Sequence, residues 1–135
     1  MSAEARPAPR PLPHPTVDTA PFWEGCAAGE LRVQRCDGCG HHRFPPAPLC
    51  PRCLSRSATW MRLTGRGRVR SAVTFRQLYH PAFADALPYT IGVVDLDEGP
   101  TLYAPVPAAA QAGDRVRVEF DPAGDGVVLP RFVTP

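Results

Sequence analysis

The sequence contains no lysine and no asparagine, so all fifteen of its basic residues are arginine. Codon usage rich in G and C explains this bias simply, and selection for bidentate contacts with phosphate or carboxylate is the functional alternative. Thirteen acidic residues nearly balance the arginines. The resulting formal net charge of +2 gives no electrostatic case for a dedicated nucleic-acid-binding protein.

Long apolar runs are also missing from the sequence. No stretch of about 18 apolar residues is present, so we expect no membrane-spanning helix. The first residues lack the basic segment and apolar stretch of a signal peptide, and we therefore expect a cytoplasmic protein. In that compartment, five cysteines indicate metal binding rather than disulfides.

Proline dominates residues 1–17, where it stands at every second position from Pro7 to Pro15. Such a segment lacks backbone donors and favours polyproline II, so we predict an extended or flexible arm. The arm either has no task of its own or docks against a partner subunit. A remnant of a fusion to a longer chain is a further interpretation.

A short helix is predicted directly after the arm. Asp18 or Thr19 could cap it, Pro21 suits its first turn, and Gly29 would end it. Residues 31–35 then alternate apolar and polar side chains, as a strand does, and lead into the first cysteine pair.

From Trp60 onward the pattern is typical of an all-β protein, with short alternating runs separated by glycine-containing turns. Five antiparallel strands in so short a segment suit a small closed barrel of the OB type, and an SH3-like barrel also fits. We predict a mainly β protein in three parts: the arm (1–17), the helix and a zinc ribbon (18–57), and the barrel (58–135). The predicted barrel strands are 69–75, 89–96, 101–106, 115–120, and a fifth over 127–129 and 132–133.

Two C-x-x-C pairs, Cys36 with Cys39 and Cys50 with Cys53, form the strongest motif in the sequence. Four thiolates at this spacing match the tetrahedral preference of zinc, so we predict one structural Zn²⁺. We expect Gly38 and Gly40 to allow a tight first turn with positive φ. A mononuclear iron uses the same ligands and is the alternative metal.

Other uses of these cysteines are less well supported. A redox dithiol needs a single reactive pair, and a catalytic zinc needs an open position that four thiolates do not leave. His41 and His42 lie beside the first pair and are interpreted as exposed loop residues. Cys26 falls on the predicted helix and is interpreted as a small buried hydrophobic residue.

Several short motifs follow one another in a distinctive order along residues 18–134. The motifs are Phe22-Trp23-Glu24-Gly25, Cys36-x-x-Cys39-Gly40, Phe44-Pro45-Pro46, Cys50-Pro51-x-Cys53, Gly65-x-Gly67-x-Val69, His80-Pro81-x-Phe83, Pro88-Tyr89, Asp95-Leu96-Asp97-Glu98-Gly99-Pro100, Gly113-Asp114-x-Val116-x-Val118-x-Phe120 and Leu129-Pro130-x-Phe132. Together they resemble the OB-fold/zinc-ribbon, acyl-CoA-associated family first catalogued as domain of unknown function 35.

This resemblance implies an N-terminal helix, a rubredoxin-like zinc ribbon and a C-terminal OB-fold barrel. It also implies a non-catalytic subunit that pairs with a thiolase-fold partner, including the lipid-transfer-protein-like aldolases that cleave steroid side chains. Carbon–carbon cleavage or formation on an acyl-CoA would then occur in the partner, with the acyl-CoA at or near the interface. A heterotetramer around a thiolase-fold dimer is the expected assembly.

The sequence itself shows no nucleophile elbow, no phosphate loop and no second metal motif, so we predict no catalytic residues. Because CoA carries phosphates, arginines on the ribbon and the barrel are candidates for contact with CoA or the partner. The candidate contact residues are Arg43, Arg52, Arg68, Arg70, His80 and Phe83. The rival hypothesis is a nucleic-acid-binding module, because OB barrels and zinc ribbons both serve that use.

Overall fold

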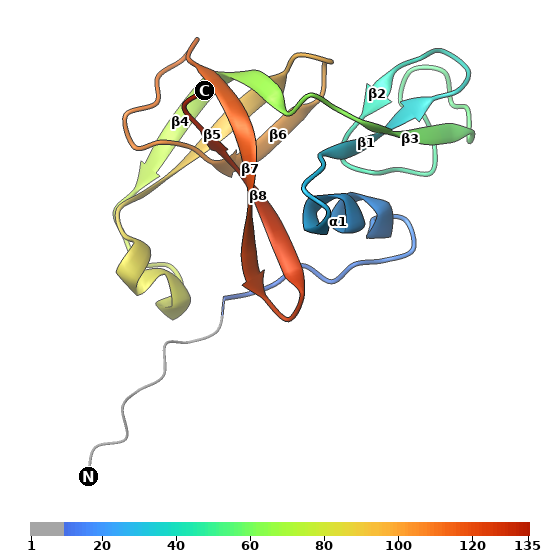
Figure 1. Cartoon of the computed structure of the whole chain (residues 1–135). Helices are drawn as coiled ribbons and strands as arrows, with labels where there is room; N and C mark the ends of the chain where they lie inside the picture. The colour runs from blue at the N-terminus through green and yellow to red at the C-terminus, as the bar shows by residue number, and fades with distance from the viewer. Residues whose placement is uncertain (1–9) are drawn as a thin grey trace.

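The computed structural model describes residues 10–135 of the chain, so the first half of the proline-rich arm lies outside the described residues. Figure 1 shows one short α-helix, a small sheet beside it and a larger sheet formed by the later strands. The elements are α1 (Ala20–Ala27), β1 (Arg32–Cys36), β2 (His42–Arg43), β3 (Ala58–Arg62), β4 (Arg66–Phe75), the 3₁₀ helix η1 (Pro81–Ala86), β5 (Tyr89–Leu96), β6 (Thr101–Pro105), β7 (Arg115–Gly124) and β8 (Val127–Val133).

Helix α1 confirms the predicted helix, with a difference at its start. Thr19 occupies the N-cap position but makes no side-chain capping bond. Its hydroxyl instead accepts a hydrogen bond from the amide of Thr16 at 2.9 Å, which closes the turn before the helix. Gly29, with φ +76°, follows the helix end as expected.

The small sheet has the order β2-β1-β3, and both pairings are antiparallel. Strand β3 pairs with β1 along its whole length, from Arg32 opposite Arg62 to Cys36 opposite Ala58. Residues 58–62, assigned to the barrel on sequence, therefore belong to the ribbon sheet. Alternation predicts a strand at this place but carries no information about which sheet it joins.

The large sheet has the order β6-β5-β4-β7-β8 with antiparallel pairing throughout, and its edge strands β6 and β8 lie against each other. This is a five-stranded, partly open barrel of the OB type, which confirms the predicted fold class. Strand β4 begins at Arg66, earlier than predicted, and β7 continues to Gly124.

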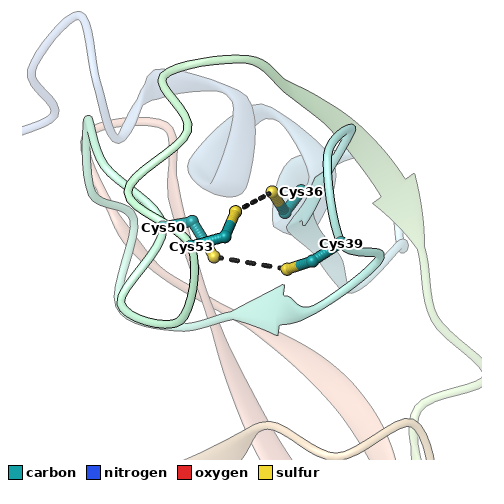
Figure 2. Close-up of side chains that lie close together, drawn as sticks. All are labelled: Cys36, Cys39, Cys50 and Cys53. Atoms are coloured by element: carbon teal, nitrogen blue, oxygen red, sulfur yellow. Dashed lines mark hydrogen bonds between the residues drawn. The ribbon is translucent and has the colours of Figure 1, made fainter.

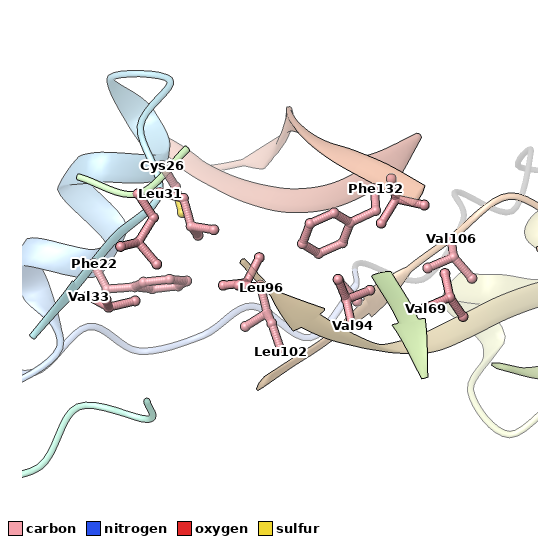
Figure 3. Close-up of a cluster of buried hydrophobic side chains, with 13 residues drawn as sticks. Phe22, Cys26, Leu31, Val33, Val69, Val94, Leu96, Leu102, Val106 and Phe132 are labelled. Atoms are coloured by element: carbon pink, nitrogen blue, oxygen red, sulfur yellow. The ribbon is translucent and has the colours of Figure 1, made fainter. Parts of the chain in front are cut away.

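One hydrophobic core joins the two sheets. Phe22 of α1 and Leu31 and Val33 beside or within β1 belong to the same buried cluster as Leu96 and Phe132 of the barrel. Figure 3 shows these side chains from helix, ribbon and barrel in one row. The ribbon is therefore packed on the barrel rather than tethered to it.

The link between the sheets, residues 63–65, is also hydrogen-bonded to the ribbon at one end and to the barrel at the other. The amide of Leu63 donates to the carbonyl of Leu31 at 2.8 Å, and the amide of Val118 donates to the carbonyl of Gly65 at 2.8 Å. Within residues 10–135, no helix has the length and apolar character needed to cross a bilayer.

Candidate metal centre and candidate contact residues

Two similar turns, the zinc knuckles, present the four cysteines. In the first knuckle the amide of Gly40 donates to the carbonyl of Cys36, and in the second the amide of Leu54 donates to the carbonyl of Cys50, both at 2.9 Å. In each knuckle the amide of the first cysteine also donates to the carbonyl five residues later, at 2.8 Å and 2.9 Å respectively. The chain therefore builds the same turn twice, and each copy aims two sulfurs inward.

The four sulfur atoms lie within 4.8 Å of one another. The Cys36 and Cys53 sulfurs are 3.4 Å apart and the Cys39 and Cys50 sulfurs are 3.6 Å apart, so each close pair joins one knuckle to the other (Figure 2). These distances exceed an S–S bond of about 2 Å. They are near the roughly 3.8 Å edge of a tetrahedron with Zn–S bonds of about 2.3 Å, so the group fits zinc.

Backbone amides prepare these thiols for ionisation. The amide of Cys39 is the main reason that the pKa of Cys36 falls to about 6. Burial opposes ionisation of Cys50, but the amides of Cys53 and Arg52 outweigh it and lower the pKa. The amide of Ser55 favours the Cys53 thiolate, yet the neighbouring sulfurs, Cys36 foremost, raise the pKa of Cys53 to about 12. A divalent cation among the four sulfurs would remove this mutual repulsion, as zinc–thiolate sites require.

Of the two glycines singled out in the first knuckle, only one matches its prediction. Gly40 has φ +77°, and Leu54 at the same place in the second knuckle has φ +64°. Gly38 does not have positive φ, and a Cβ there would meet its neighbours at ordinary distances of 3.5–3.7 Å. The tight knuckle needs a left-handed residue after its second cysteine, not between the two.

Asp37 braces the first knuckle against β3. Its carboxylate accepts hydrogen bonds from the hydroxyls of Ser57 at 2.6 Å and Thr59 at 2.7 Å. Its amide donates to the carbonyl of Ser57 at 3.0 Å. The bond from Ser57, and then that from Thr59, holds the pKa of Asp37 below its usual value.

Replacing Asp37 by alanine should loosen the first knuckle and speed metal release. We expect zinc transfer to a chromophoric chelator to become several times faster, with Asp37→Asn intermediate because its amide oxygen keeps one acceptor. Because the folded-state pKa is lowered, the stabilisation by Asp37 is present above about pH 4 and is lost as the pH falls through that folded value. Equal release rates for the three proteins at pH 7 would contradict this role.

The candidate contact residues do not form one cluster. Arg43 and Arg52 lie on the ribbon, Arg68 and Arg70 lie on β4, and the remaining two lie at η1. Arg43 is buried, and its Nε donates to the Gln34 side chain at 3.1 Å. Its NH1 has no hydrogen-bond partner among the described residues.

The two candidate arginines on the barrel already make hydrogen bonds within the chain. Arg70 lies in a β-bulge between Val69 and Ser71 and binds Asp95 through Nε at 3.0 Å and NH2 at 2.6 Å. Arg68 donates to the carbonyl of Gly113 at 3.2 Å. Binding of a phosphate at Arg70 would have to displace an exposed bidentate ion pair.

His80 caps η1, with its Nδ1 accepting a hydrogen bond from the amide of Ala82 at 3.1 Å. This bond places the proton of the neutral ring on Nε2, so Nε2 is a donor. The ring contacts Phe83 edge-on at 5.9 Å between centroids. These two contacts fix the orientation of the His80 ring.

Two apolar features form only when distant parts of the chain come together in the fold. Phe75, Tyr79, Phe83 and Tyr89 form an aromatic cluster at the β4–β5 end of the barrel, with Phe75 and Tyr89 stacked at 5.1 Å. A cavity of about 450 Å³ also opens where helix, ribbon and barrel meet. Its walls come from Phe22, Trp23, Phe44, Pro45, Leu102, Tyr103 and Pro130, among others. The aromatic residues are visible in the sequence, but their convergence depends on tertiary packing.

Comparison with known proteins gives matches over both parts of the chain. A family model described as "ChsH2, rubredoxin-like zinc ribbon domain" matches residues 23–58, and one described as "ChsH2, C-terminal OB-fold domain" matches residues 60–121. The DUF35 domain-containing scaffold protein of Pyrococcus furiosus is 32% identical over an alignment of 102 residues, and the match covers 67% of this chain and 71% of that protein.

Two longer relatives carry names of enzyme subunits. The "Probable enoyl-CoA hydratase alpha subunit" of Thermomonospora curvata is 33% identical over an alignment of 127 residues, and the match covers 91% of this chain and 39% of the relative. The 3-oxo-4,17-pregnadiene-20-carboxyl-CoA hydratase alpha subunit of Mycobacterium tuberculosis is 34% identical over an alignment of 112 residues, and the match covers 80% of this chain and 35% of the relative. The chain thus spans little more than a third of the length of these two relatives.

A solved structure called "Ltp2-ChsH2(DUF35) aldolase" contains a chain with the same fold. The TM-score is 0.82 at 31% sequence identity, and the match covers 91% of this chain and 98% of that one.

Proposed function

Because the chain belongs to the DUF35 family of ChsH2-type proteins, with a rubredoxin-like zinc ribbon and an OB-fold, we propose that it is a non-catalytic accessory subunit. In this proposal it binds a thiolase-fold, lipid-transfer-protein-like partner and supports acyl-CoA carbon–carbon bond cleavage or formation. The observation that carries the proposal is the structural match, over 91% of this chain, to a chain of the structure called "Ltp2-ChsH2(DUF35) aldolase", whose name joins two components.

We further propose that the four cysteines hold one Zn²⁺ whose role is structural. Four thiolates complete a tetrahedral shell and leave no position for a reacting water. The knuckles place all four ligands without help from another chain. The ion would therefore order the ribbon, and the chemistry would belong to the partner.

The substrate class follows from the named relatives rather than from a feature of this chain. One is named for an enoyl-CoA and another for a steroid-derived acyl-CoA. We propose steroid side-chain retro-aldol cleavage as the reaction, with the acyl-CoA at or near the interface, and a heterotetramer as the assembly. The absence of disulfides among the described cysteines suits a reducing cytoplasm.

The rival function is nucleic-acid binding. The aromatic cluster at the β4–β5 end, with Tyr79 exposed, favours it because bases stack on such side chains. Against it, four of the barrel's seven arginines are held in ion pairs with carboxylates, namely Arg70, Arg115, Arg117 and Arg131. A salt-dependent shift of single-stranded DNA would support the rival.

The test is co-expression with a candidate thiolase-fold partner protein. Gel filtration should show the two proteins eluting together. An acyl-CoA cleavage assay should show that the partner's activity depends on this chain, with each protein assayed alone as the control. If the two proteins neither elute together nor affect each other's activity, the accessory-subunit proposal fails.

A further inference from the structure

We propose that the second zinc knuckle, residues 49–56, is an anchor by which this subunit binds its protein partner. In this proposal Leu54 inserts into an apolar pocket whose rim carries carboxylates, and Arg52 and Arg56 contact that rim. The inference rests on the proposed function and deepens it, because it names the surface and the kind of partner that the surface fits.

Leu54 has a backbone conformation that is unfavourable for leucine. Its φ of +64° lies in the left-handed region, where the equivalent position of the first knuckle has Gly40 at φ +77°. The turn geometry explains why the backbone is left-handed here, but it does not explain why a side chain with a Cβ occupies the position. Glycine at this position would relieve the strain. The presence of leucine instead indicates a function for its side chain.

The Leu54 side chain does not pack into the hydrophobic core of the described part of the chain. Leu54 is 71% exposed, and Leu49 at the start of the same knuckle is 38% exposed. Neither residue belongs to the hydrophobic core or to the side chains packed against it. An exposed apolar side chain gains stability only when another surface covers it, as at the centre of a protein interface.

The charge around this apolar centre selects the kind of partner. Residues 30–62 hold six arginines and two acidic residues, whereas residues 63–135 hold seven arginines and eight acidic residues. The excess positive charge of the chain therefore lies on the ribbon. Arg52 and Arg56 are exposed and make no ion pair among the described residues.

An acidic protein surface satisfies both features at once. Carboxylates can bind the planar guanidinium groups through paired hydrogen bonds. A phosphate backbone would also attract the arginines, but it offers no apolar pocket for Leu54. The observations thus favour a protein over a nucleic acid.

The knuckle is also well suited to binding because its shape is fixed in advance. The amide of Leu54 donates to the carbonyl of Cys50 at 2.9 Å, and the amide of Cys50 donates to the carbonyl of Ser55 at 2.9 Å. With Cys50 and Cys53 held by a metal, little backbone freedom remains to be lost on association. Binding through a preorganised turn costs less entropy than binding through a flexible loop.

The variant Leu54→Gly separates an anchoring role from a structural one. Removing the side chain should weaken binding to the co-expressed thiolase-fold protein at least tenfold. The same change relieves the left-handed strain and should raise the Tm of the isolated zinc-loaded chain by about 4 °C. Binding and stability therefore move in opposite directions, as measured by titration calorimetry and by thermal unfolding.

A second variant and a control complete the test. The double variant Arg52→Glu with Arg56→Glu should slow association and remove most of its salt dependence. Val73→Thr, at a 59% exposed position on β4, should change the affinity less than twofold.

Three outcomes would overturn the inference. The first two leave the proposed function standing: wild type and Leu54→Gly bind the partner equally tightly, or Leu54→Gly lowers both affinity and Tm. In the third, the wild-type chain binds single-stranded DNA but not the thiolase-fold protein, and the double arginine variant abolishes this DNA binding. If the wild-type chain does not bind the thiolase-fold protein at all, both the proposed function and the proposed docking surface are refuted.

Discussion

Replacing Cys36 by serine is expected to release the metal and unfold the ribbon. The Cys36 side chain is fully buried, and its sulfur lies 3.4 Å from that of Cys53. Structural zinc sites contribute roughly 10–16 kcal/mol in apparent terms, which rivals the whole stability of a typical domain. Metal content should fall from one zinc per chain to none, and the amides of residues 30–62 should lose their protection from hydrogen exchange.

The matched control is Cys26→Ala. Cys26 is also buried, and burial raises its pKa to about 11, but it is not a member of the four-sulfur group. The variant should keep its zinc and lose only the modest stability of a small core cavity, about 1 kcal/mol. If Cys36→Ser loses zinc yet still forms the complex at full strength and supports full activity, the ribbon is not needed for assembly.

Replacing Gly65 by alanine should strongly destabilise the fold without touching the metal site. Gly65 has φ +76°, and a Cβ there would collide with the side chain of Val118. The left-handed backbone costs about 1–2 kcal/mol for a residue with a Cβ, and overpacking adds about 1–3 kcal/mol. We expect the free energy of unfolding to fall by about 3 kcal/mol in guanidinium titrations of the zinc-loaded protein.

Gly126 supplies the control for this change. Its φ of +75° nearly equals that of Gly65, but no atom lies within 4 Å of the place where its Cβ would be. Gly126→Ala should therefore cost only the backbone part, about 1–2 kcal/mol. Adding Val118→Ala to Gly65→Ala should recover part of the loss. Equal costs at the two glycines would show that the contact with Val118 does not matter.

The sequence was most informative where local chemistry alone decides the structure. The C-x-x-C spacing predicts the four-sulfur group because a turn of that length can aim two thiols at one ion. Pro21 and Gly29 bracket the helix for equally local reasons, as α1 confirms. Alternating side chains predicted barrel strands such as β5, in which every second residue is buried.

Features that depend on distant parts of the chain could not be predicted in this way. The pairing of β3 with β1 joins segments separated by more than twenty residues, and strand alternation does not specify partners. The left-handed backbone of Leu54 was missed because leucine gives no signal for positive φ. The contacts of Arg70 with Asp95 depend on a bulge that shifts the phase of β4.

The common core of ribbon and barrel has a consequence for how the chain can be divided. The two family models meet between residues 58 and 60, which falls inside β3. A cut there would split a paired strand, and a cut at residues 63–65 would expose Leu31 and Val33 on one piece and Leu96 and Phe132 on the other. The catalogued modules are therefore not separate folding units. Two such fragments would be stable only when they reassemble, as the halves of a split protein do. Gene fusions can therefore extend the chain at its ends but cannot separate its two sheets.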